Sequence, residues 1–168
     1  MIIGCDPGSV TMGLATIDGD DAQAVALSAP AGMVDSDLRI DRLARRLETA
    51  FAEGCFEGAT LFAIERQHSF GNSADGPLYA AAHRFRVIAK RRGLRVVELD
   101  PPAWREAAVG FGNADKQQTL AAMNLMWGLE LTDDNAGDAL GIATAAAAGV
   151  VGRKQGRAKA FRRSRRRK

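Results

Sequence analysis

The chain begins with MIIGCDPGSVTMGLATI (residues 1–17), and the rest of the sequence is best understood outward from this segment. An apolar run of strand length ends in Asp6-Pro7-Gly8, a turn signal, and a second run rich in Val, Thr and Ile follows, so the segment predicts a β-hairpin. Gly8 and Gly13 leave room for another backbone or a phosphate to come close. Asp6 is unusual here, because a buried ionised carboxylate is costly unless it is paired or binds a metal. The alternative is that Asp6 only caps the turn.

The same pattern recurs further along the chain. Residues 60–64 form a short apolar run that predicts a buried strand, and Glu65 follows directly. A third acid, Asp138, falls in the first turn of a helix predicted over about 135–151. Strands that end on the same side of a sheet would bring Asp6 and Glu65 within metal-bridging reach, and a helix over that edge could add Asp138. An acid in a first turn can also simply complement the helix dipole.

Three carboxylates in this arrangement suit magnesium. Mg²⁺ prefers hard oxygen ligands and keeps several waters, so two or three carboxylates and a substrate phosphate are enough. Two such ions about 4 Å apart can activate the attacking water and stabilise the leaving oxygen of a phosphodiester. No Ser-His-Asp or Cys-His spacing competes with this interpretation, and the two histidines, His68 and His83, are too few for a zinc site.

The remaining pattern predicts an α/β fold built on a mixed five-stranded sheet flanked by helices. Strands 1–3 are expected to be antiparallel hairpin strands and the other two parallel to the first, since strand, helix and strand in succession are typical of a parallel βαβ unit. The further elements expected are strands over 23–28 and 94–99, and helices over about 35–54, 78–92, 102–109 and 115–127.

Length and composition indicate one soluble domain. The 168 residues are 46% hydrophobic and 26% charged, which suffices for a buried core. The longest apolar runs are too short and too rich in Ala and Gly to span a membrane, and the start of the chain lacks the basic region of a signal peptide. We therefore expect a cytoplasmic protein without a membrane partner. Cys5 and Cys55 are expected to be small core residues in a reducing compartment.

The net charge of +3 is unevenly distributed. Residues 152–168 contain ten Lys and Arg and no acid, whereas residues 1–151 contain thirteen basic and 20 acidic residues, a net charge of −7. We therefore expect a folded domain over 1–151 and a basic, flexible DNA-binding tail over 152–168, with Arg153 and Lys154 at its start. Nucleic acid is the expected partner because counterion release favours such a density of positive charge. The alternative is a tail that only solubilises the protein.

Four segments resemble, in order, the signature segments of RuvC-type Holliday-junction resolvases. They are IGCDPGS (3–9), IERQ (64–67), VGFGNADK (109–116) and DNAGDALGIA (134–143). The resemblance holds from residue 1 to about 151, and only the basic tail falls outside it. It implies a ribonuclease H-like fold, a homodimer, and Mg²⁺-dependent nicking of four-way DNA junctions with two ions, for which Mn²⁺ would substitute. The helix over 78–92 is a candidate dimer surface, although its apolar stripe would equally serve as core.

Carried over position by position, the resemblance implies that Asp6, Glu65 and Asp138 are metal-binding catalytic carboxylates. Many family members have a fourth acid, or a His, three residues before the last Asp, where this chain has Asn135. Asp134 lies on nearly the same helical face and could substitute for that acid. Alternatively, Asn135 is a neutral metal ligand, which would weaken a second metal site.

The same resemblance implies contacts to DNA. Lys116 would contact a phosphate or assist catalysis, and Arg105 would be a second basic contact. Phe70 sits in the loop where the family places an aromatic residue that stacks at the junction, although its offset from Glu65 differs. Arg66, directly after that carboxylate, is a further expected DNA contact.

The leading hypothesis is therefore a structure-selective DNA endonuclease that resolves four-way junctions. The alternatives are a nuclease of the same fold acting on structured RNA or on other branched DNA (flaps, forks), and a non-catalytic junction-binding protein, which would gain nothing from the three acids. An ATPase of the actin and sugar-kinase type would need two domains and a second Gly-rich phosphate loop, for which this chain has no room.

Overall fold

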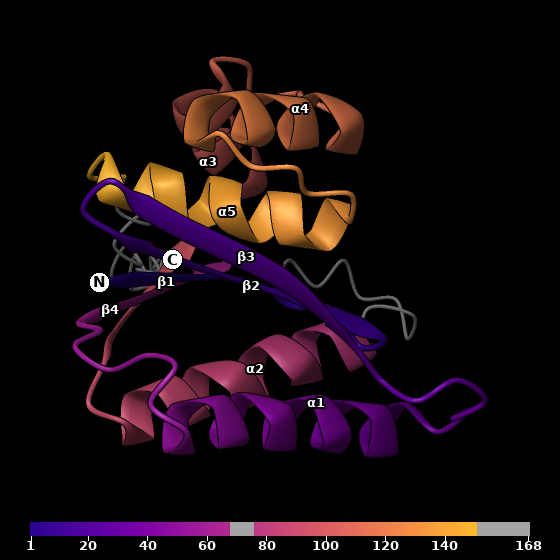
Figure 1. Ribbon diagram of the computed structural model, residues 1–168. Coiled ribbons are helices and arrows are strands. Elements are labelled where there is room, and N and C mark those ends of the chain that lie inside the picture. The colour runs from indigo at the N-terminus through magenta and orange to yellow at the C-terminus, as the bar shows by residue number, and fades with distance from the viewer. Residues whose placement is uncertain (68–75, 151–168) are drawn as a thin grey trace, which may run out of the picture.

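The computed structural model describes residues 1–67 and 76–150, and one mixed sheet forms its centre (Figure 1). The strands are β1 (Ile2–Asp6), β2 (Thr11–Asp18), β3 (Asp21–Ser28), β4 (Leu61–Glu65) and β5 (Arg95–Leu99). Their order across the sheet is β3-β2-β1-β4-β5. The first three strands pair antiparallel, whereas β4 is parallel to β1 and β5 is parallel to β4. The mixed five-stranded sheet expected from the sequence is confirmed.

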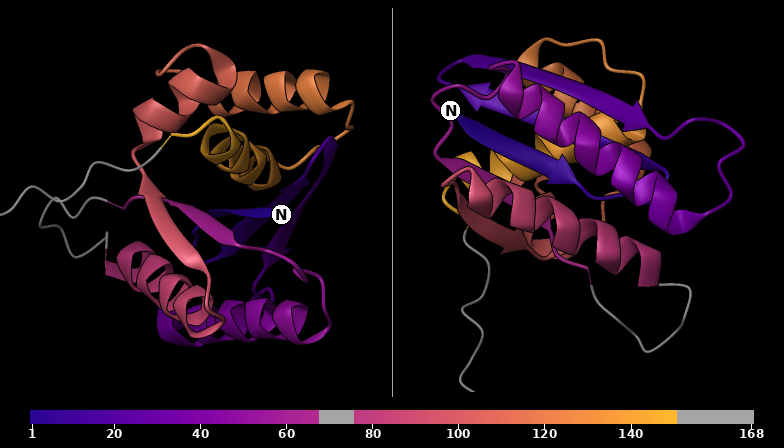
Figure 2. Two further views of the ribbon diagram at one scale, coloured as in Figure 1. Left: turned by 90° about the vertical axis from the view of Figure 1, so that its left-hand side faces the viewer. Right: turned by 90° about the horizontal axis from the view of Figure 1, so that it is seen from below.

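Helices cover both faces of this sheet (Figure 1). On one face, α1 (Ser36–Ala52) and α2 (Gly76–Arg91) lie side by side (Figure 2). On the other face lies α5 (Asp134–Ala147), and α3 (Pro101–Val109) and α4 (Lys116–Trp127) stack on its outer side. Because α5 is enclosed between the sheet and two helices, residues 136–146 are all buried. This enclosure explains why its sequence is mostly apolar and rich in Ala and Gly, with Asp138 and Thr144 as its buried polar residues.

Two glycines of the sheet allow α5 to approach it closely. A Cβ atom at Gly4 would lie 2.2 Å from the carbonyl oxygen of Ala139, and one at Gly13 would lie 1.9 Å from the carbonyl oxygen of Asn135. Both distances are far below van der Waals contact, so any larger residue would displace the helix backbone. The space expected at Gly13 is therefore filled by a helix backbone of this chain.

The apolar stripe of α2 faces inward. Its members Ala81, Ala82, Phe85, Ile88 and Ala89 are buried in the cluster that joins α1 and α2 to the sheet. Of the two interpretations of this stripe, the structure supports core packing. Among the helices of the described residues, none is long and apolar enough to cross a lipid bilayer.

The final helix is shorter than the sequence predicted. It ends at Ala147, not near Val151, because Gly149 adopts a left-handed backbone with φ of +85° that stops the helix. It also begins at Asp134, so Asp138 is the fifth helical residue and lies beyond the first turn in which it was expected.

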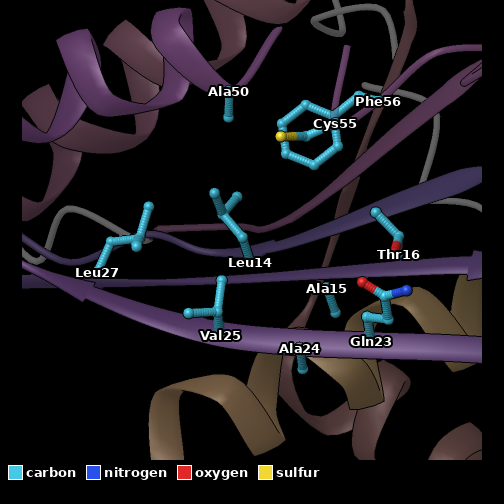
Figure 3. Close-up of a pocket in the computed structure, with 10 residues that line it drawn as sticks. All are labelled: Leu14, Ala15, Thr16, Gln23, Ala24, Val25, Leu27, Ala50, Cys55 and Phe56. Carbon is cyan, nitrogen blue, oxygen red and sulfur yellow. The ribbon is translucent and has the colours of Figure 1, made fainter. Parts of the chain in front are cut away.

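The prediction that both cysteines are core residues is wrong for Cys55. Cys5 is fully buried, whereas Cys55 is exposed in the turn after α1. With Phe56, Ala50 and Leu14 it lines an apolar hollow of about 280 Å³ beside β2 and β3 (Figure 3). Cys55 lies beyond the end of α1 at Ala52, so it is not part of the buried face of that helix.

Replacing Gly4 by Ala is expected to destabilise the protein by roughly 2–4 kcal/mol, because the new methyl group would collide with the backbone of α5. Urea denaturation would measure this loss. Gly76→Ala is the matched control, because a Cβ there meets no atom within 4 Å. Equal free energies of unfolding for the two variants would contradict the close packing of α5.

Candidate active site

Asp6 and Glu65 emerge at the same edge and on the same face of the sheet. Because β1 and β4 are parallel with Cys5 opposite Ile64, the residues that follow this pair lie next to each other. Successive side chains of a strand point to opposite faces. Cys5 and Ile64 pack into the cluster under α1 and α2, so Asp6 and Glu65 are directed toward α5.

Helix α5 adds Asp138 to this edge. The carboxyl group is almost completely buried, with 3% of the residue exposed. Its Oδ1 atom has no hydrogen-bond partner among the described residues, and its Oδ2 atom lies 4.0 Å from Nζ of Lys116. Lys116 is the first residue of α4, whose start is fixed by a reciprocal capping interaction between Asp115 and Gln118.

Glu65 is held by neighbours from two directions. The indole Nε1 of Trp104 donates to Oε2 at 2.9 Å, and Nε2 of Gln67 donates to Oε1 at 3.3 Å. The guanidinium of Arg105 lies 3.8 Å from the same Oε2 and stacks on the Trp104 ring at 4.7 Å. The sequence did not predict this role of Trp104. A tryptophan on a short helix gives the same sequence pattern whether its ring only packs in the core or its indole N–H also donates to a carboxylate.

The site concentrates negative charge where water has little access. Burial, reinforced by Glu65 and Asp138, raises the pKa of Asp6 to about 8. Burial also raises the pKa of Asp138 to about 6, and Lys116 and Arg105 oppose this shift. The positive charges of Lys116 and Arg105 therefore compensate the charge of the three carboxylates only partly.

This donor set fits a hard divalent cation. Carboxylate oxygens are the ligands that Mg²⁺ and Mn²⁺ prefer. The unpartnered Oδ1 of Asp138 is free to bind a cation, and the raised pKa of Asp6 shows that its ionised form is unfavourable here unless a positive charge is added. Among the described residues, 1–67 and 76–150, no three Asp, Glu, His or Cys side chains lie close enough together to hold an ion by themselves. Waters or a substrate phosphate would have to complete the coordination.

The two candidates for a fourth ligand have different surroundings. Oδ1 of Asp134 accepts a hydrogen bond from Nε2 of Gln117 at 3.1 Å, and Asp134 contributes to the raised pKa of Asp138. The amide of Asn135 instead donates to Oδ1 of Asp133, the N-cap of α5, at 2.9 Å. Of these two candidates, Asp134 is the one that contributes to the electrostatics of Asp138.

The expected DNA-contacting residues fall into three groups. Lys116 and Arg105 are brought to the carboxylates, as described above. Arg66 instead donates from Nη1 to both carboxylate oxygens of Asp100, at 3.0 and 3.1 Å, so this nitrogen pairs with Asp100 and not with the carboxylates of the site. The others lie outside the described residues, namely Phe70, Arg153 and Lys154.

Comparison with known proteins relates this chain to one family. The family model described as crossover junction endodeoxyribonuclease RuvC matches residues 2–146. The protein of that name from Chloroflexus aggregans is 32% identical over 158 residues, covering 84% of this chain and 88% of its own length. The one from Chromohalobacter salexigens is 30% identical over 155 residues, covering 85% and 78%.

Solved structures show the same relationship at the level of the fold. RuvC of T. thermophilus, solved in complex with Holliday junction substrate, superimposes with a TM-score of 0.68 at 22% identity. The match covers 87% of this chain and 92% of that chain. The common architecture is the ribonuclease H-like fold expected from the sequence.

Asp6→Asn is expected to stabilise the protein at pH 8 in the presence of a chelator. The folded protein keeps the Asp6 proton up to a pKa of about 8, whereas the unfolded chain releases it near 3.8. The stability contributed by this group is thus fully present below about pH 4 and is lost as the pH rises toward 8. Urea denaturation should show a gain of roughly 2–5 kcal/mol for the variant at pH 8, discounted for partial exposure, and a much smaller one at pH 5.

Asp20→Asn, in the exposed turn between β2 and β3, is the control for this change. Adding Mg²⁺ at pH 8 should narrow the difference between wild type and Asp6→Asn, because a bound cation favours the ionised carboxylate. A gain of equal size at both pH values would contradict the assignment of the shifted pKa to Asp6.

Proposed function

The chain belongs to the RuvC family of crossover junction endodeoxyribonucleases, and on that premise we propose that it resolves four-way DNA junctions by paired, Mg²⁺-dependent phosphodiester hydrolysis in recombination and repair. The observation that carries this proposal is the meeting of Asp6, Glu65 and Asp138 at one edge of the sheet. Two of these come from parallel strands and the third from a helix more than seventy residues further along the chain.

In this proposal Asp6, Glu65 and Asp138 are the metal ligands. When bound, two Mg²⁺ ions, or Mn²⁺ in their place, would supply the activation of water and the charge stabilisation that hydrolysis of a phosphodiester needs. Asp134 is the better candidate for a fourth ligand, because it is a charged carboxylate that acts electrostatically on Asp138, whereas Asn135 is a neutral amide.

The two basic side chains of the site, Lys116 and Arg105, would bind the DNA substrate. Lys116 has 53% of its side chain exposed, so its ammonium group can reach a phosphate while remaining near Asp138. Arg105, held by stacking on Trp104, presents a second positive charge beside Glu65. Both would offset the repulsion between the anionic backbone of DNA and the carboxylates.

Two copies are needed for paired cuts, since the described part of one chain, residues 1–67 and 76–150, provides one such site. We propose a homodimer with two-fold symmetry, which matches two symmetric nicks in a four-way junction. The domain of residues 1–151 has a net charge of −7, so the ten basic residues of 152–168 would supply much of the affinity for DNA. A cytoplasmic location follows from this role.

Incubation with end-labelled DNA tests the proposed activity. A synthetic four-way junction should be nicked in pairs with Mg²⁺, and a linear duplex with the same arms should stay intact. EDTA should abolish cutting, and Asp6→Asn should lower the rate by at least about a hundredfold, because a metal ligand is lost.

Asp20→Asn is again the matched control, because it removes the same charge from an exposed turn. Junction binding without cutting by the wild-type protein would identify a binding protein. Cutting of flaps, forks or structured RNA in preference to the junction would identify a different substrate for the same fold.

Removal of residues 152–168 should weaken junction binding by about tenfold or more at moderate salt, and it should reduce the slope of log K against log salt. Fluorescence anisotropy with a labelled junction at several salt concentrations measures both quantities. Unchanged affinity with an unchanged salt slope would contradict a DNA-binding role for this segment.

A further inference from the structure

Trp104 connects the two halves of the active site. It is fully buried near the start of α3 and contacts both the strand carboxylate and the helix that carries Asp138. Its indole Nε1 donates to Oε2 of Glu65 at 2.9 Å. On the other side, its ring packs on Gly141 of α5 so closely that a Cβ there would lie 2.7 Å from Cζ3.

The contact with Gly141 places the ring beside the turn of α5 that bears Asp138. Positions three residues apart on a helix lie on nearly the same face. The tryptophan therefore occupies the space between Glu65 and the segment of α5 that holds the buried carboxylate, and its size helps to set their separation.

The chemistry of the indole group limits what it can do there. An indole nitrogen is a hydrogen-bond donor only, so it cannot bind a cation and can act only by orienting the carboxylate that accepts from it. A buried, packed ring has one orientation, so the hydrogen bond fixes the rotation of the Glu65 carboxyl group. The same ring supports the stacked guanidinium of Arg105, which lies 3.8 Å from the same oxygen.

We propose that Trp104 is a positioning residue, which holds the Glu65 carboxylate and Arg105 in place for binding of the divalent cation. The proposal rests on the proposed role of Glu65 as a metal ligand. Groups that orient metal ligands in this way typically change metal affinity by about 10- to 100-fold when they are removed. Phe at position 104 would keep most of the ring but could not donate to Glu65.

The chain provides a matched control in its second tryptophan. Nε1 of Trp127 donates to Oγ1 of Thr144 at 3.0 Å, so Trp127→Phe also removes an indole hydrogen bond near α5, but one that does not involve the carboxylates. The full-length variants Trp104→Phe and Trp127→Phe would be titrated with Mn²⁺ and monitored by the electron paramagnetic resonance signal of the free ion, with urea denaturation alongside.

We expect Trp104→Phe to weaken Mn²⁺ binding by about 10- to 100-fold and to lower kcat for junction cutting more than it changes KM. Trp127→Phe should stay within about twofold of wild type in Mn²⁺ affinity, whatever its loss of stability. Equal Mn²⁺ affinity for Trp104→Phe and wild type, or equal losses for both variants, would overturn the proposal.

Fluorescence provides a second readout that does not require Trp104→Phe to fold. In Trp127→Phe, Trp104 is the only tryptophan left. Its emission should change on addition of Mg²⁺, and the added substitution Glu65→Gln should abolish the change. Unaltered emission at saturating Mg²⁺ would overturn the proposal.

Failure of the positioning role and failure of the proposed function give different results. Normal junction cutting and cation binding in Trp104→Phe would leave the nuclease function intact and overturn the role of Trp104. Cation binding that depends on Trp104, in a wild-type protein that cuts no junction, would support the positioning role and contradict the nuclease.

Discussion

The close contact between α5 and the strands β1 and β2 is the constraint on which the site depends. Gly4 and Gly13 remove the side chains that would keep the helix away from the sheet. The helix is therefore near enough for Asp138 to share an edge with the two strand carboxylates, although it is enclosed on its outer side by α3 and α4. Close packing of this kind transmits small displacements, because protein interiors leave few voids to absorb them.

The arrangement that brings the acids together also makes them costly to hold. The two nearby bases are at 3.8 and 4.0 Å from carboxylate oxygens, at the long end for ion pairs, and one oxygen of Asp138 has no hydrogen-bond partner among the described residues. Burial of like charges destabilises the fold and raises the pKa values of Asp6 and Asp138. Such a cluster is typical of a functional site. Its carboxylates lower the folding stability of the protein without ligand, and a bound ligand neutralises their charge.

The sequence predicted the sheet and the two strand carboxylates well because the information was local. Apolar runs followed by Asp6 and Glu65 indicate strand ends, and parallel pairing then places both at one edge. Tertiary contacts were not accessible in this way. The hydrogen bond from Trp104 to Glu65 depends on how α3 packs, and the exposure of Cys55 depends on where the turn after α1 lies. The four matching segments supplied the functional assignment, which residue chemistry alone had restricted only to metal-dependent phosphodiester chemistry.

The central claim is that the three carboxylates form a divalent-cation site, and anomalous X-ray scattering from crystals soaked in Mn²⁺ tests it most directly. We predict anomalous peaks within about 2.5 Å of carboxylate oxygens of Asp6, Glu65 and Asp138. Peaks confined to other parts of the protein, in crystals of a protein that cuts junctions with Mn²⁺ in solution, would contradict the account.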